Sequence, residues 1–131
     1  MKLKYDNLTR TSHDPDGVET RIPGFGNSTT VEWLDPSQRS FSIYFATIVS
    51  HLIPLGYIRG VNIHGAPYDF RKAANEHGKY FDMVKDLVEQ TYAANGDTPV
   101  ILLTHSMGSP MMLYFLLNQV LDSVILDTTI S

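Results

Sequence analysis

The stretch Pro99-Val100-Ile101-Leu102-Leu103-Thr104-His105-Ser106-Met107-Gly108 joins a short apolar run to a polar turn, and an apolar segment follows it. A continuous apolar run between turn residues is typical of a parallel strand that is buried on both faces. Pro110 is tolerated in the first turn of a helix, where the backbone N–H has no intrahelical partner. We therefore predict a strand over 99–103, a sharp turn at Ser106 and a helix that starts near Gly108 to Pro110.

An abrupt strand-to-helix turn strains the backbone of its middle residue and projects that side chain clear of the sheet. The residues two before and two after it must be small. Gly108 meets this demand, whereas Thr104 meets it only in part, because a β-branched side chain stands where glycine is usual. The pattern predicts that Ser106 is an exposed nucleophile and that the backbone N–H of Met107 binds an oxyanion. The alternative is that Ser106 only caps the helix.

His105 is not predicted to be the general base. Side chains of neighbouring residues leave the turn in different directions, so His105 is expected to pack near the site. In a turn of this kind the acid and the base follow the nucleophile in the chain, yet no histidine follows Ser106 in the 131 residues. A complete catalytic triad cannot be assembled from this chain alone.

The other histidines offer little for metal binding. His13 and His77 lie in polar surroundings and are expected to be exposed. His64 could join His77 and Asp69 at a metal, but no helical i, i+4 histidine pair or tight ligand spacing supports this, so we expect no metal site.

Apolar periodicity predicts the remaining elements. Helices are expected over 41–52, ending at Pro54 and Gly56, and over 80–92, ending at Asn95-Gly96-Asp97. Shorter strands are expected over 18–22, 31–34, 57–63 and 123–126. This alternation predicts a parallel sheet with right-handed crossover helices.

We predict one incomplete domain over 1–131. It consists of a polar lead with short strands (1–40), a helix-strand core that contains the turn (41–118) and a divergent tail (119–131).

Composition excludes several classes of protein. The chain has 131 residues, a net charge of −4 and no cysteine, which removes disulfide frameworks and thiolate catalysis. Without a run of Lys or Arg, we expect no nucleic-acid partner.

Residues 1–6 have no apolar region typical of a secretory signal, so no signal is expected there. Two glycosylation triplets, Asn7-Leu8-Thr9 and Asn27-Ser28-Thr29, are patterns that also arise by chance.

Four ordered motifs carry a family resemblance. They are Pro15-Asp16-Gly17-Val18 with Ile22-Pro23-Gly24-Phe25-Gly26, then Leu34-Asp35-Pro36-Ser37, then Gly65-Ala66-Pro67-Tyr68-Asp69-Phe70-Arg71, and finally Leu103-Thr104-His105-Ser106-Met107-Gly108. With them the chain resembles the lecithin:cholesterol acyltransferase family, and within it the lysosomal phospholipase A2 branch, over roughly residues 3–118.

The resemblance implies a partial α/β-hydrolase fold in which the turn at Ser106 is the nucleophile elbow. Ser106 matches the family's nucleophile, Met107 the backbone donor after it, and residues 65–71 a segment near the mouth of the active site. Asp69 and Arg71 are spaced to form an ion pair that braces that segment. The resemblance further implies a phospholipid or lipid ester substrate, contact with a membrane surface, no metal or organic cofactor, and a lysosomal or extracellular location.

The predicted function is that of a fragment of a serine lipid acyl hydrolase or O-acyltransferase. It would act on glycerophospholipid esters through an acyl-serine intermediate. One alternative is another α/β-hydrolase, an esterase or a thioesterase, since the elbow specifies acyl chemistry and not the acyl group. The other is a catalytically inert truncated product, and we expect the chain alone to be nearly inactive.

Overall fold

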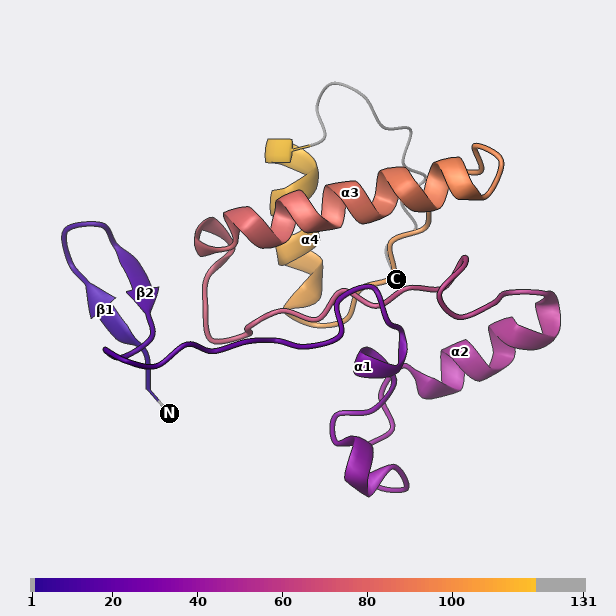
Figure 1. Cartoon of the computed structure of the whole chain (residues 1–131), viewed down its shortest axis with the longest axis horizontal. Coiled ribbons are helices and arrows are strands. Elements are labelled where there is room, and N and C mark those ends of the chain that lie inside the picture. Colours follow the sequence, from indigo (N-terminus) through magenta and orange to yellow (C-terminus); the bar gives the residue numbers. More distant parts are fainter. Residues whose placement is uncertain (1, 120–131) are drawn as a thin grey trace. The chain divides into compact units, whose positions relative to one another are not determined.

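The computed structural model describes residues 2–119 (Figure 1). The elements, in which η marks a short 3-10 helix, are β1 (Lys4–Asp6), β2 (Thr11–His13), α1 (Thr29–Glu32), η1 (Pro36–Gln38), α2 (Ala46–Leu52), η2 (Ile53–Leu55), η3 (Ala74–Glu76), α3 (Gly78–Ala94) and α4 (Gly108–Gln119). The predicted strand over 123–126, and all of the predicted tail except Gln119, lie outside the described residues.

The described residues form two compact units. The first unit contains residues 2–21, 69–86 and 101–119, and the second contains 22–68 and 87–100. The helix α3 contributes its first half to the first unit and its second half to the second unit. The turn at Ser106 belongs to the first unit.

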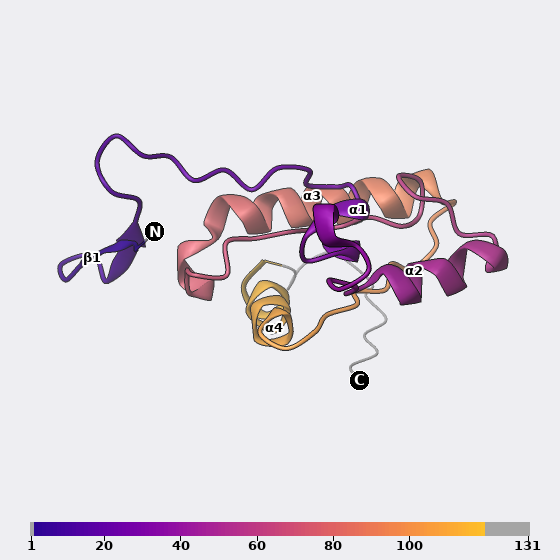
Figure 2. The same ribbon diagram turned by 90° about the horizontal axis from the view of Figure 1, so that it is seen from below.

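In the first unit, the start of α3 packs against α4, which crosses behind α3 in Figure 1 and is seen nearly end-on beside it in Figure 2. Phe81 of α3 and Phe115 of α4 are each 1% exposed, and their rings stack with centroids 5.8 Å apart. Met111 and Val84 are buried with them. Burial of two aromatic rings and two aliphatic side chains makes this the apolar core of the unit.

Both helices of this core were predicted from the sequence, and both predictions are confirmed. Phe81, Val84 and Val88 recur at helical spacing and are buried. The chain leaves α3 through Gly96 and Asp97, which have φ values of 67° and 58° in the left-handed region. The helix α4 begins at Gly108, so Pro110 stands in its first turn as expected.

In the second unit, α2 begins later than predicted. The sequence pattern placed its start at Phe41, whereas the helix starts at Ala46 and Phe41 is almost fully exposed. The Asp35 carboxylate accepts a hydrogen bond from the N–H of Ser37 (2.8 Å) and starts η1. The Ser42 hydroxyl donates to the carbonyl of Asp35 (2.7 Å), which closes a turn in the segment predicted as the first helical turn. The predicted end is confirmed, since Gly56 has φ of 94°.

The predicted parallel sheet is not present in residues 2–119. Their only sheet is the antiparallel hairpin of β1 and β2, in which Lys4 lies opposite His13. Residues 18–22 form no strand, 29–32 are helical, and 57–63 contain only an isolated bridge between Arg59 and Ile63.

The apolar run 99–103 belongs to no helix or strand within the described residues, so the prediction of a buried strand is wrong for this structure. Ile101 is 62% and Leu103 is 53% exposed. A strand is defined by hydrogen bonds to a neighbouring strand, and apolar side chains cannot supply that neighbour.

None of the helices among residues 2–119 combines the length and the apolar composition needed to cross a bilayer.

Candidate active site

Ser106 lies at a sharp bend between the extended segment that ends at His105 and the first turn of α4. Its φ is 54°, in the left-handed region that residues with a Cβ rarely adopt, and the residue is exposed. Arg10 and Asp97 are the other non-glycine residues with positive φ in the described part of the chain. The sharp bend that the sequence predicted at Ser106 is therefore present, and it carries backbone strain.

Backbone hydrogen bonds between residues three apart in the chain hold this bend. The N–H of Gly108 donates to the carbonyl of His105 (3.0 Å), and the N–H of Ser109 donates to the carbonyl of Ser106 (3.1 Å). A Cβ added at Gly108 would lie 3.6 Å from the Cβ of Thr104, an ordinary contact distance. Thr104 is thus accommodated opposite Gly108.

The polar groups at the bend are available to a ligand. Within residues 2–119, the Ser106 hydroxyl makes no hydrogen bond, and the N–H of Met107 donates to no backbone carbonyl. A capping serine would accept a hydrogen bond from the first turn of the helix, so capping does not explain Ser106 in this structure. His105 is exposed, and no hydrogen bond joins it to Ser106.

The predicted pair of Asp69 and Arg71 is confirmed. Arg71 donates from Nε and Nη2 to the two carboxylate oxygens of Asp69, at 2.8 and 2.6 Å. Nη2 also lies 3.1 Å from the Thr20 hydroxyl and 3.6 Å from the Asp14 carboxylate. The side-chain hydrogen bond from Arg71 lowers the pKa of Asp69. The guanidinium therefore ties the lead segment to residues 69–71.

His77 was expected to be exposed, and this is wrong. It is 7% exposed, and its ring lies edge-on to Tyr80 and Phe81, with centroid distances of 5.6 and 6.3 Å. Its Nε2 lies 3.2 Å from the carbonyl of Asp69, and burial lowers the pKa of the imidazole. The polar neighbours in sequence suggested solvent, but the start of α3 turns the ring onto the aromatic core.

The described residues contain no group of three His, Asp or Glu side chains placed to hold a metal ion. His64 lies with its two ring nitrogens 3.1 and 3.2 Å from the carbonyls of Gly26 and Val61.

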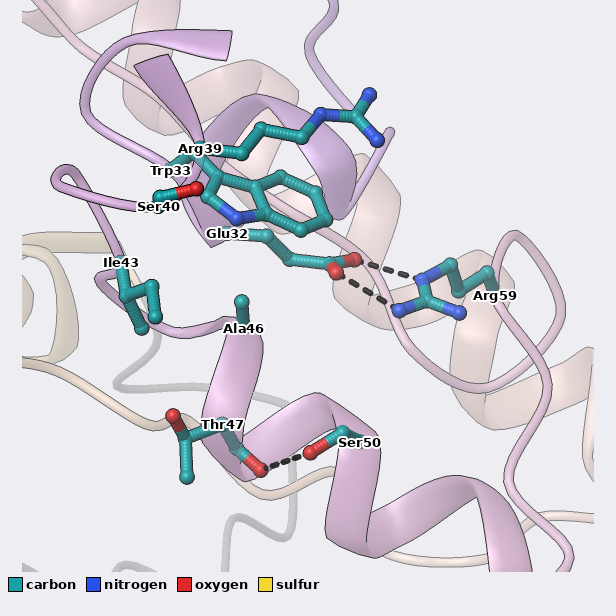
Figure 3. A pocket seen from close by; sticks show the side chains of 9 residues that line it. All are labelled: Glu32, Trp33, Arg39, Ser40, Ile43, Ala46, Thr47, Ser50 and Arg59. Atoms are coloured by element: carbon teal, nitrogen blue, oxygen red, sulfur yellow. Dashed lines mark hydrogen bonds and ion pairs between the residues drawn. The ribbon is translucent and has the colours of Figure 1, made fainter.

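The second unit contains an open hollow of about 410 Å³ (Figure 3). Glu32, fully buried, lies on its wall and accepts two hydrogen bonds of 2.7 Å from Arg59, which lower the pKa of the carboxyl group. Arg39 stacks on the Trp33 ring at 4.6 Å. Sequence reasoning missed this ion pair, although an acidic residue inside the apolar stretch 31–34 is a signal that a buried carboxylate needs a partner.

Comparison with known proteins places these features in context. A family model described as lecithin:cholesterol acyltransferase matches residues 1–131. Lysosomal phospholipase A and acyltransferase is 47% identical in rat and 45% in human, in each case over 91% of this chain and 29% of the relative. Mouse phosphatidylcholine-sterol acyltransferase is 41% identical over 90% of this chain and 26% of the relative. The chain thus spans less than a third of the length of these curated relatives.

Proposed function

The chain belongs to the lecithin:cholesterol acyltransferase family, and on that premise we propose that it forms part of a serine-dependent lipid acyl hydrolase or O-acyltransferase. One observation carries the proposal: Ser106 is exposed, has φ of 54° and stands directly before the first turn of α4. A nucleophile elbow requires this strained backbone, because it presents the hydroxyl to the substrate.

In the proposed reaction, Ser106 Oγ gives its proton to a histidine and attacks the carbonyl carbon of a glycerophospholipid ester. The C–O bond to the glycerol oxygen then breaks, the glycerol oxygen takes up the proton, and the acyl group remains on Ser106. Water or a second alcohol then accepts the acyl group. The N–H of Met107 and one further donor stabilise the oxyanion. No histidine follows Ser106 in this sequence, so the scheme needs a base from a further segment of chain.

We propose that residues 99–103 become an interior strand of an α/β-hydrolase sheet within a single domain. The exposure of both Ile101 and Leu103 supports this, since an apolar strand without neighbours leaves its hydrogen-bonding groups and side chains uncovered.

The proposed substrate is a phospholipid or a related lipid ester at a membrane surface. The names of the two relatives, a lysosomal phospholipase A and acyltransferase and a phosphatidylcholine-sterol acyltransferase, support this substrate class, and a lysosomal or extracellular location is proposed on the same basis. The apolar side chains of Leu103 and Met107, on either side of Ser106 in sequence, are exposed and suit contact with acyl chains. The proposed reaction uses no metal or organic cofactor.

A chimera tests the proposal. The 119-residue segment that is 47% identical to the rat relative replaces the matching segment of that relative. We expect the chimera to release fatty acid from phosphatidylcholine vesicles and to form an acyl-enzyme at Ser106. The matched control is the same chimera with Ser106→Ala, which keeps the fold and removes the hydroxyl.

A folded chimera, judged by its melting transition, that releases no fatty acid contradicts the proposed function. Release that persists in the Ser106→Ala chimera contradicts the role of Ser106. Turnover of a short-chain ester or a thioester, but not of phosphatidylcholine, supports the alternative esterase or thioesterase.

A further inference from the structure

The turn at Ser106 contains a side-chain pair that the function proposed above does not use. The hydroxyls of Thr104 and Ser109 are hydrogen-bonded across the turn, with their oxygens 3.0 Å apart. We propose that Thr104 and Ser109 are positioning residues that hold Ser106 in its left-handed conformation. This inference rests on the proposed role of Ser106 as the nucleophile.

The pair is placed to act on the bend and on little else. Thr104 belongs to the extended segment before Ser106, and Ser109 is the second residue of α4. Both residues are half-buried, so water competes only in part for their hydroxyls. The backbone bonds of Gly108 to His105 and of Ser109 to Ser106 close the helical side of the bend. The hydroxyl pair adds a bond between α4 and Thr104, a residue that lies before the bend.

Thr104 is also the residue that departs from the small residue expected at an elbow. Glycine at position 104 would leave more room but could make no side-chain hydrogen bond. The threonine fits opposite Gly108, where a Cβ added at position 108 would lie at an ordinary contact distance of 3.6 Å from the Thr104 Cβ. Threonine at position 104 therefore causes no clash and gains the hydrogen bond to Ser109.

That contact bears on the proposed chemistry through Ser106 and Met107. A residue with a Cβ disfavours the left-handed region, so Ser106 relaxes away from it unless the flanking backbone is held. Relaxation would turn both the Ser106 hydroxyl and the N–H of Met107, which directly precedes α4. One neutral hydrogen bond typically shifts such an equilibrium about three- to tenfold.

Amide hydrogen exchange in the 131-residue chain tests the pair without any need for catalysis. We expect the amides of Gly108 and Ser109 to exchange roughly three- to tenfold faster in Thr104→Val, which replaces the hydroxyl by a methyl of similar size. Ser109→Ala should give the same increase, and the double variant no more than either single one. Thr104→Ser keeps the hydroxyl and should exchange like the unmodified chain.

The amides of Val84 and Val88 in α3 are the internal control, and their exchange should not change. Unchanged exchange at Gly108 and Ser109 in Thr104→Val overturns the inference. An equal increase at the α3 amides overturns it too, because the pair would then serve only global stability.

Steady-state kinetics of the chimera described above connect the pair to the nucleophile. We expect Thr104→Val to lower kcat roughly three- to tenfold with little change in KM, and Thr104→Ser to restore kcat. Unchanged kcat in an active chimera with Thr104→Val overturns the inference. Inactivity of the chimera with Thr104 and Ser109 intact contradicts the proposed function instead, and hydrogen exchange then still decides whether the pair holds the bend.

Discussion

At the scale of single residues, Ser106 combines exposure with a strained backbone. Its φ of 54° would suit a glycine better than a serine. Strain that persists at an exposed polar residue points to selection for the position of its side chain, because the fold itself would be more stable without it.

Ser106→Gly is expected to raise the free energy of unfolding by about 0.5–1 kcal/mol. Relief of a left-handed conformation is worth roughly 1–2 kcal/mol, and the entropy of a glycine in the unfolded chain offsets about 0.5–1 kcal/mol of that. Urea denaturation measures the change. Asp97→Gly, at an exposed position with φ of 58°, is the control and should gain less, since Asp tolerates this region better than Ser. A clear loss of stability in Ser106→Gly would contradict strain at this bend.

Glu32→Gln is expected to cost about 2 kcal/mol of unfolding free energy. Breaking a fully buried ion pair costs roughly 3–5 kcal/mol, and the cost is lower here because the Arg59 side chain is 39% exposed while that of Glu32 is fully buried. The pKa of Glu32 is lowered, chiefly by the hydrogen bonds from Arg59, so its contribution is present above about pH 4.5 and is lost as the pH falls through the folded pKa.

Denaturation with urea at neutral pH and near pH 4 measures both effects of Glu32→Gln. Glu19→Gln removes an exposed pair with Arg21 and should change stability by less than about 0.5 kcal/mol. A similar loss from both variants would show that the burial of Glu32 does not matter.

At the scale of elements, the apolar stripe determines whether a helix forms, and local hydrogen bonds determine where it begins and ends. The helix α3 has both a stripe and a left-handed exit through Gly96 and Asp97, so its predicted range is close to the observed one. The helix α2 has the stripe, but the Ser42 hydroxyl donates to the carbonyl of Asp35 and closes a turn that includes the first residues of the predicted helix.

The start of α3 is expected to lose stability as the pH falls from about 7.5 to 5.5, because burial lowers the pKa of His77. The unfolded chain then binds a proton more tightly than the folded one, so stability is full above the unfolded pKa and declines as the pH drops toward the folded pKa. Lys72 and Asp69 are the charged groups that act on the ring.

Urea denaturation as a function of pH measures this slope. His77→Gln should flatten it, and His13→Gln, at an exposed position in β2, should leave it unchanged. A slope that persists in His77→Gln would assign the pH dependence to another group.

At the scale of the whole molecule, one compact unit contains the strained bend at Ser106, and the other contains a buried ion pair with an open hollow. It spans less than a third of the length of its curated relatives. In the function proposed above, Ser106 is one member of a triad, and the two other members act through hydrogen bonds around it.

A polypeptide of these 131 residues is expected to hydrolyse phosphatidylcholine on the order of 10⁶-fold more slowly in kcat than the rat relative. That factor corresponds to loss of the general base from a serine triad. Release of fatty acid from vesicles measures it, with Ser106→Ala as the blank. Turnover within about 100-fold of the relative would show that a histidine of this chain serves as the base.

The sequence by itself determined the helices α3 and α4 and the bend between the apolar run and α4, because apolar periodicity, Pro110 and the flanking small residue act locally. It also determined the pairing of Asp69 with Arg71, two residues apart. Tertiary structure alone decided the burial of His77, the pairing of Glu32 with Arg59 and the unpaired state of residues 99–103. Glu32 is 27 residues from Arg59, and a strand at 99–103 needs a neighbouring strand from elsewhere, so a local pattern carries no information about either. His77 is buried because the start of α3 turns its ring onto Phe81 and the aromatic core.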